Sequence, residues 1–134
     1  MKCTFTSEIT DEEIRNVELK LKFEFPEDFK EFIKINNGGY PEKDIFKLNG
    51  LNESINHFLT FKENVRGNMI NSNVLEDLEG IRDTFVAIAT DSFGNDIVFN
   101  REDKKIMFYE HEEEAKYYLA DTFTEFLELL FSKE

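Results

Sequence analysis

A helix is predicted from about residue 11 to residue 22, because large apolar residues there recur every three or four positions and charged residues fill the rest. Thr10 and Glu13 have the spacing of a capping box, which satisfies backbone donors at a helix start. Ile9 is placed to touch Ile14 across the same turn. The expected buried stripe consists of Ile14, Val17 and Leu21.

A second helix is predicted to begin at Pro26, whose missing N–H is not needed in a first helical turn. Asp28 lies where the helix dipole favours an anion. The run Asn37-Gly38-Gly39 tolerates positive φ and predicts the helix end, and Pro41 prevents the helix from resuming. The expected buried face consists of Phe29, Phe32, Ile33 and Asn36.

A third helix is predicted at the end of the chain, where Asp121-Thr122 precedes a helical stripe. Glu125 follows Thr122 at capping-box spacing. The stripe consists of Phe123, Phe126, Leu127 and Leu130.

An antiparallel meander is predicted between the second and third helices. Residues 85–89 and 97–99 are short apolar runs that flank a turn containing Gly94, which is typical of strand, turn and strand. A polar turn then leads to a third strand at 105–109.

The middle of the chain is less regular. Short apolar segments at 45–48 and 58–61, separated by Asn49-Gly50 and polar residues, predict strands. Residues 62–83 are polar and poorly periodic and predict a loop, with a short helix indicated only by Val74, Leu75 and Leu78.

These elements predict one α+β domain over residues 1–134, with a mainly antiparallel sheet packed against two N-terminal helices and one C-terminal helix. The phenylalanines at helical spacing could line a binding groove, but their periodicity favours a core. The predicted core consists of Ile14, Val17, Leu21, Phe29, Phe32, Ile33, Val86, Ile88, Val98, Phe123, Phe126 and Leu127.

Acidity is the unusual property of the composition. The chain has 29 Asp and Glu against 16 Lys and Arg, a net charge of −13. Such a chain is repelled by phosphate backbones and anionic lipids, so we expect it to bind neither nucleic acid nor membranes. The charge is uneven, because residues 1–67 carry a net −3 and residues 68–134 a net −10.

Disulfides, metals and cofactors are not expected. Cys3 is the lone cysteine and there are two histidines, so no cluster has zinc-ligand spacing. The first residues lack the apolar stretch of a signal peptide, and the longest apolar run, 85–89, is far too short to span a bilayer. We expect a cytoplasmic protein.

Catalysis is also not expected. The chain has no nucleophile elbow, phosphate-binding loop, dinucleotide fingerprint or zinc-protease motif. Gly38-Gly39 follows a helix instead of preceding one, and His57 is interpreted as a residue that starts a strand. Cys3 lacks a neighbouring base.

His111 lies among Glu110, Glu112, Glu113 and Glu114, which leaves two interpretations open. These residues could form a metal or acid–base site if their side chains converged. Adjacent positions generally diverge, so a solvated acidic segment is favoured. Asp91 and Asp96 flank Gly94 in an order that does not match a calcium loop, and we expect them to serve the turn.

Three stretches in order resemble a known family. The first runs from Ile14 through Phe25-Pro26-Glu27-Asp28-Phe29 to Asn36-Asn37-Gly38-Gly39. The second is the strand, glycine turn and strand from Val86 to Ile97, and the third is the closing helix from Ala120 to Leu127. Together they resemble the SMI1/KNR4 (SUKH) family over nearly the whole chain.

That resemblance implies a function. Bacterial members are commonly immunity proteins that bind and neutralise a cognate toxin domain of polymorphic or contact-dependent systems, often a nuclease. The resemblance therefore implies a toxin protein as partner, and the acidity of this chain indicates a basic one. The alternative is a non-catalytic regulatory or scaffold domain, because eukaryotic members of the family look like adaptors. We expect a monomer when free.

The predicted contact surface is the acidic later part of the chain. Aromatic anchors often dominate interface energies, while charges set the rate of encounter, so both kinds of residue are included. For any single carboxylate, the alternative is that it only maintains solubility. The predicted partner-binding residues are Asp91, Asp96, Tyr109, Glu110, Glu112, Glu113, Glu114 and Tyr117, with Tyr118 as a further aromatic anchor.

Overall fold

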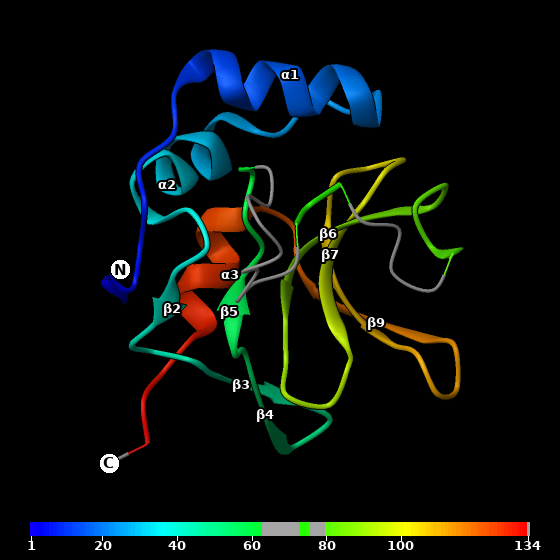
Figure 1. Ribbon diagram of the computed structural model, residues 1–134. Helices are drawn as coiled ribbons and strands as arrows, with labels where there is room; N and C mark the ends of the chain where they lie inside the picture. Colours follow the sequence, from blue (N-terminus) through cyan, green and yellow to red (C-terminus); the bar gives the residue numbers. More distant parts are fainter. Residues whose placement is uncertain (63–72, 76–79, 134) are drawn as a thin grey trace.

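A five-stranded antiparallel sheet with the strand order β5-β6-β7-β8-β9 forms the centre of the computed structural model, which describes residues 1–62, 73–75 and 80–133 (Figure 1). Within those residues, three helices and two small two-stranded sheets complete an α+β domain, as predicted. The helices are α1 (Asp11–Leu21), α2 (Glu27–Asn36) and α3 (Phe123–Leu129). The strands of the central sheet are β5 (His57–Phe58), β6 (Phe85–Thr90), β7 (Asp96–Asn100), β8 (Ile106–Glu110) and β9 (Ala115–Ala120).

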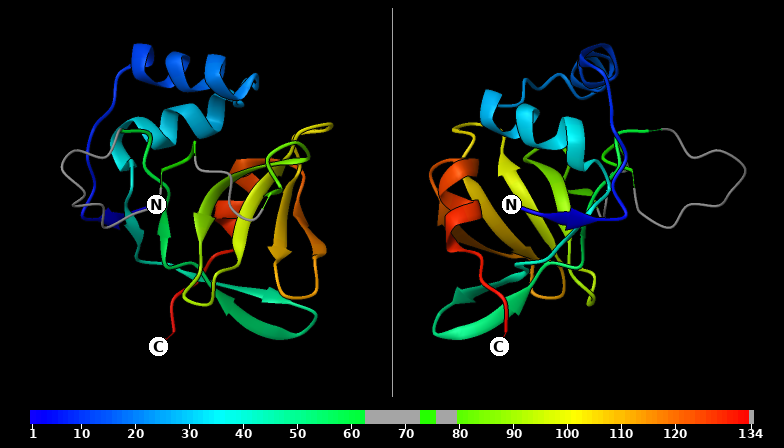
Figure 2. Two further views of the ribbon diagram at one scale, coloured as in Figure 1. Left: turned by 45° about the vertical axis from the view of Figure 1, so that its right-hand side comes forward. Right: turned by 90° about the vertical axis from the view of Figure 1, so that its left-hand side faces the viewer.

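The small sheets pair β1 (Cys3–Thr4) with β2 (Tyr40–Pro41), and β3 (Ile45–Leu48) with β4 (Leu51–Ser54). Helices α1 and α2 lie together at one end of the molecule, and the β3–β4 hairpin lies at the opposite end (Figures 1 and 2). The turn that joins β3 to β4 has positive φ at both Asn49 and Gly50, a conformation that suits a two-residue hairpin.

Helix α1 begins as the sequence predicts. The Thr10 hydroxyl accepts from the Glu13 N–H at 3.1 Å, and the Glu13 carboxylate accepts from the Thr10 N–H at 3.0 Å. Lys22 closes the helix in the left-handed conformation. Ile14, Val17 and Leu21 are all buried, so the predicted stripe is confirmed.

Helix α2 differs slightly from the prediction, because Pro26 is its N-cap and Glu27 its first residue. The fixed φ of proline fits both positions. The helix ends before Asn37, and the Gly39 N–H donates to the Asn36 carbonyl at 3.0 Å. Gly39 fits closely here, because an added Cβ would lie 2.7 Å from Thr6 Cγ2 and something would have to shift.

Phenylalanine rings join the helices to the sheet. Phe29 of α2 is fully buried and packs on Phe123 of α3 at 4.9 Å and on Phe99 of β7 at 5.3 Å between ring centroids. Ten of the twelve predicted core residues are buried; Phe32 and Leu127 are only partly buried against the core. Both lie beside the buried stripe of their helices. Because a helix has 3.6 residues per turn, a side chain at the margin of the stripe is only half covered.

The predicted meander is confirmed, but the structure adds β1, β2, β4 and β9, which were missed. The apolar segment 58–61 is a strand only at Phe58, where β5 ends. Within the predicted loop at 62–83, Val74 and Leu75 form a turn, whereas Leu78 lies outside the described residues.

Candidate functional site

Two turns meet at one end of the central sheet. The first, residues 91–95, joins β6 to β7, and the second, residues 111–114, joins β8 to β9. The His111 N–H donates to the Asn95 side-chain oxygen at 3.2 Å, which ties the turns together. The sheet register explains this contact, because Asp96 pairs with Tyr109 and so places the turn ends side by side.

Asp91 organises the first turn. Its Oδ1 accepts from the Phe93 and Asn95 N–H groups, both at 2.8 Å, and its Oδ2 accepts from the Asn95 side chain at 3.1 Å. Only 7% of Asp91 is exposed. Asp91 therefore serves the turn, as predicted, and leaves little of its surface for the predicted contact with a partner.

Asp96 lies beneath the turns. It is 1% exposed, and its Oδ2 lies 2.6 Å from Nε2 of the buried His111 side chain. Burial raises the pKa of Asp96 to about 6, and the hydrogen bond and charge of His111 oppose that rise. Asp96 therefore links the end of β8 to the start of β7 inside the molecule, and almost none of its surface is exposed for the predicted contact with a partner.

Tyr109 is likewise an internal residue. It is 9% exposed, and its ring meets the His111 ring edge-on at 4.8 Å between centroids. It also packs on the Phe85 ring, at 5.4 Å between centroids. Alternation along β8 places the Tyr109 ring against one face of the sheet, so little of it is exposed for the predicted role as an anchor.

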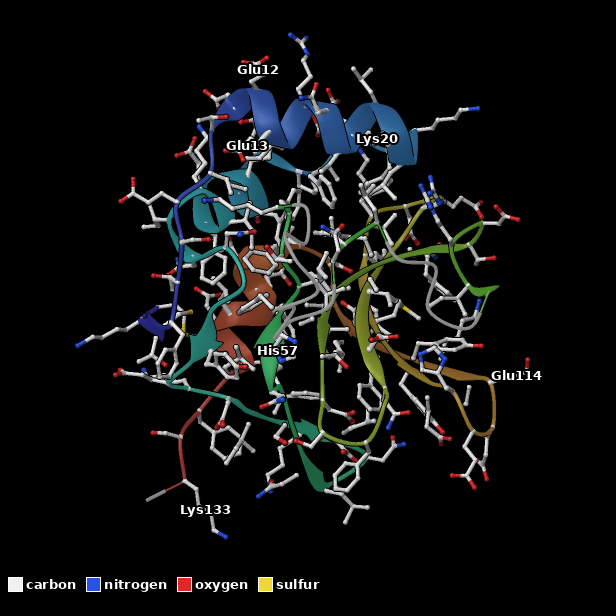
Figure 3. The ribbon with its side chains drawn as sticks, viewed as in Figure 1. Glu12, Glu13, Lys20, His57, Glu114 and Lys133 are labelled. Carbon is white, nitrogen blue, oxygen red and sulfur yellow. The ribbon has the colours of Figure 1, made fainter. Side chains whose placement is uncertain are left out.

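The remaining acidic residues do face solvent. Glu112, Glu113 and Glu114 are exposed, and Glu110 is partly exposed with its carboxylate accepting from the Glu113 N–H at 2.9 Å. Glu114 lies at the outer margin of the molecule, far from His57 and from Glu12 of α1 (Figure 3). Glu112, Glu113 and Glu114 therefore have the solvent exposure that contact with a partner needs.

Phe93 was missed by the sequence analysis. It is 83% exposed at the tip of the first turn, and it borders a hollow of about 460 Å³ that Glu110, Glu112 and Glu113 also line. A phenylalanine inside a tight turn has no apolar face to pack on, and that signal was available in the segment Asp91-Ser92-Phe93-Gly94. We call the set Phe93, Glu110, Glu112, Glu113 and Glu114 the acidic turn surface.

The other two predicted tyrosines lie on β9, which begins directly after Glu114. Tyr117 is partly buried, with its ring 6.5 Å from that of Phe108. Tyr118 is 55% exposed and donates its hydroxyl proton to Asp121 at 2.8 Å. Tyr118 therefore suits an anchor better than Tyr117.

The other residues considered for catalysis, His57 and Cys3, lie in environments that offer little reactivity. His57 is the first residue of β5, as predicted, and burial lowers its pKa, which favours the neutral imidazole. Cys3 pairs with Pro41 in the β1–β2 ladder, and burial raises the pKa of its thiol to about 11, which disfavours the nucleophilic thiolate. Among the described residues, no three His, Cys, Asp or Glu side chains are grouped to hold a metal ion.

The described part of the chain also contains no helix with the length and apolar character needed to cross a membrane.

The fold and this surface together define an α+β domain with an exposed aromatic side chain among carboxylates at one end of its sheet. The chain belongs to the SMI1 / KNR4 family (SUKH-1), whose family model matches residues 8–129. That family is generally associated with immunity proteins of toxin–immunity systems. A comparison with curated proteins finds no significant match.

Proposed function

We propose that this protein is an immunity protein that binds a cognate toxin domain and neutralises it by covering its active or substrate-binding surface. The family supports a protein partner of this kind. The observation that carries the proposal is the acidic turn surface, in which an exposed aromatic ring stands among carboxylates.

The parts of this surface have distinct roles in the proposal. Carboxylates at Glu112, Glu113 and Glu114 attract a basic cleft and raise the association rate. Phe93 enters the partner and slows dissociation, since buried aromatic side chains dominate many interfaces. Asp91 holds the turn rigid through three hydrogen bonds, so little conformational entropy is lost on binding.

A basic cleft is the expected counterpart because the whole chain carries −13 and the later half carries most of that charge. Toxins that cleave nucleic acids need such clefts to bind phosphates. Acidic side chains placed over the cleft would exclude the substrate without any catalytic step. We therefore propose that the protein acts by occlusion and is not an enzyme.

Co-expression tests the proposal. The C-terminal domain encoded by the neighbouring upstream reading frame is expressed with and without this protein, and growth is measured together with complex formation by gel filtration. We expect rescue of growth and a stable complex. Toxicity that persists despite abundant immunity protein, with no complex, would overturn the proposal.

The same assay separates inhibition from catalysis. Purified toxin is mixed with increasing amounts of this protein, and residual toxin activity is measured. Occlusion predicts a linear loss of activity that ends at a fixed stoichiometric ratio. A small amount of this protein that inactivates a large excess of toxin over time would instead indicate an enzyme.

A further inference from the structure

The central sheet has one covered edge and one open edge in the described part of the chain. At the covered edge, the Phe58 N–H of β5 donates to the Gly39 carbonyl at 2.9 Å. At the other edge, β9 pairs with β8 and with no other described strand. β9 lies at the outer margin of the sheet in Figures 1 and 2.

The backbone direction at this open edge follows from the ladder. The Asn100 N–H donates to the Lys105 carbonyl at 2.9 Å, so that carbonyl points toward β7. Peptide groups alternate along a strand, and Phe108 and Glu110 of β8 therefore direct their N–H and C=O groups toward β9. Their partners are Tyr117 and Ala115, which leaves Lys116 and Tyr118 with backbone N–H and C=O groups that point outward.

The edge carries little of the usual protection against strand addition. Exposed edges are commonly guarded by proline or by charged side chains. β9 contains no proline, and the Lys116 ammonium lies over the Phe85 ring at 6.0 Å, across the face of the sheet. The register shift opposite Ile106 and Met107 limits the regular open segment to residues 115–118.

Charge decides which strand this edge accepts. Glu112, Glu113 and Glu114 precede β9 and provide most of the negative charge beside it; Asp121, which follows β9, has a carboxylate oxygen 3.8 Å from the Lys105 ammonium. If a second copy paired antiparallel across this edge about Tyr117, the glutamates of each copy would lie beside Asp121 of the other. Two chains of net charge −13 would also repel each other, so a second copy is disfavoured.

We propose that the open edge of β9 binds an extended, basic segment of a protein partner as a sixth strand of the sheet. Backbone hydrogen bonds at Lys116 and Tyr118 provide the pairing, and lysine or arginine side chains of the partner lie near the glutamates at one end of the edge. If the proposed function is right, the segment belongs to the toxin, and strand addition adjoins the contact made by the acidic turn surface.

A peptide experiment tests the edge without the toxin. Isotope-labelled protein is mixed with a synthetic peptide of alternating lysine and valine, and amide hydrogen exchange is followed by NMR; a peptide of alternating glutamate and valine is the matched control. We expect at least about fivefold slower exchange at Lys116 and Tyr118 with the basic peptide only, consistent with formation of one backbone hydrogen bond at each amide. The Tyr117 amide should not change.

Other results of this experiment would overturn the proposal. Equal effects of both peptides would show that charge does not select the strand. No protection at Lys116 and Tyr118 would show that the edge is closed to strands. Protection that appears without peptide and grows with protein concentration would indicate a second copy as the occupant.

A matched pair of variants tests the edge in the complex with the toxin domain. Lys116→Pro removes the outward N–H and the side-chain charge, while Lys116→Ala removes only the side chain. We expect both variants to have similar thermal midpoints, since prolines are tolerated at edge positions whose N–H is unpaired in the sheet. We expect Lys116→Pro to bind about fivefold or more weakly than Lys116→Ala, the effect of one lost hydrogen bond.

The two proposals fail in different ways. Equal affinity of both variants for the toxin would overturn strand addition and leave the proposed function intact. If the parent protein does not bind the toxin domain, the proposed function is wrong, and the peptide experiment still decides whether the edge accepts a basic strand.

Discussion

Nε2 of His111 lies 2.6 Å from Oδ2 of Asp96, and both side chains are buried beneath the two turns that carry the acidic turn surface. Asp96 begins β7 and His111 follows β8, so their contact fixes the ends of both strands. The pair therefore links the protonation of Asp96 to the arrangement of the turns above it.

Asp96 should make folding stability depend on pH. Burial raises its folded pKa to about 6, above the value of an unfolded aspartate. Between about pH 4 and pH 6 the folded chain then binds more protons than the unfolded chain. The contribution of Asp96 to stability is therefore full below this pH window and is lost as the pH rises through it. Relative to the parent, Asp96→Asn should gain up to about 3 kcal/mol in unfolding free energy across this window.

Urea unfolding across this pH range measures the effect. Glu102→Gln, at an exposed residue in the turn between β7 and β8, is the control and should follow the parent profile. If the unfolding free energies of the parent and of Asp96→Asn changed with pH in parallel, the raised pKa of Asp96 would be contradicted.

Phe93→Ala should weaken toxin binding without weakening the fold. Because the ring is 83% exposed, its removal creates no cavity and should change the thermal midpoint very little. Removal of a central anchor typically costs more than about 1.4 kcal/mol, so we expect at least about tenfold weaker binding with faster dissociation. Surface plasmon resonance with the toxin domain provides both rate constants.

Phe99→Ala is the contrasting variant. This ring is fully buried in β7 between Phe25 and Phe29, and its truncation should destabilise the fold by about 3–5 kcal/mol. If Phe93→Ala destabilised the protein to a similar degree, the ring would have a packing role and the anchor hypothesis would be wrong.

Gly39→Ala should destabilise the junction between α2 and the N-terminal strand. The new Cβ would meet Thr6 Cγ2 at 2.7 Å and both the Asn36 carbonyl oxygen and Cys3 Cβ at 3.0 Å, so the Thr6 side chain or the backbone around Cys3 must shift. Overpacking of this kind costs about 1–3 kcal/mol, which chemical denaturation can measure. Thr6→Ser removes the closest methyl group, and the double variant should recover part of the loss. If the effects of Gly39→Ala and Thr6→Ser simply added in the double variant, the methyl group introduced by Gly39→Ala and the Thr6 methyl group would not clash.

Local signals in the sequence were sufficient for the helices. Helix starts, helix ends and apolar stripes depend on residues a few positions apart, as at Thr10 and at Asn37-Gly38-Gly39. The local sequence is therefore enough to predict them. β9 was missed because its segment follows three glutamates and because its sequence does not alternate clearly between apolar and polar residues, although half-covered and exposed side chains alternate along the strand in the structure. Its pairing with β8 provides the stability that local propensity lacks.

The candidate site was predictable only in part. The exposed glutamates follow from composition and local sequence. The burial of Asp96 depends on His111, fifteen positions later, and this partner becomes visible only once the strand register is known. Asp91 resembles a surface carboxylate until its turn hydrogen bonds are seen. Polar residues with internal partners are where a rule based on charge alone fails.

Charge reversal at Glu112, Glu113 and Glu114 should slow association with the toxin. Substitution of all three by lysine replaces attraction by repulsion at the turn, and we expect the association rate at low salt to fall by about tenfold or more. The dissociation rate should change less, because rim charges mainly guide the encounter. The salt dependence should weaken as well, since fewer attractive charges remain to be screened. The thermal midpoint should stay close to that of the parent, because all three residues are exposed.

A charge-matched control separates local from global electrostatics. Lysine at Glu8, Glu42 and Glu102, which are exposed and outside the acidic turn surface, changes the net charge by the same amount. Stopped-flow association at several salt concentrations should show a much smaller effect for this control. Equal slowing of both variants would mean that net charge alone drives the encounter. If the turn variant associates and protects as the parent does at low salt, the toxin contacts another surface, and the loop around Tyr40 and Asp44 becomes the next region to test.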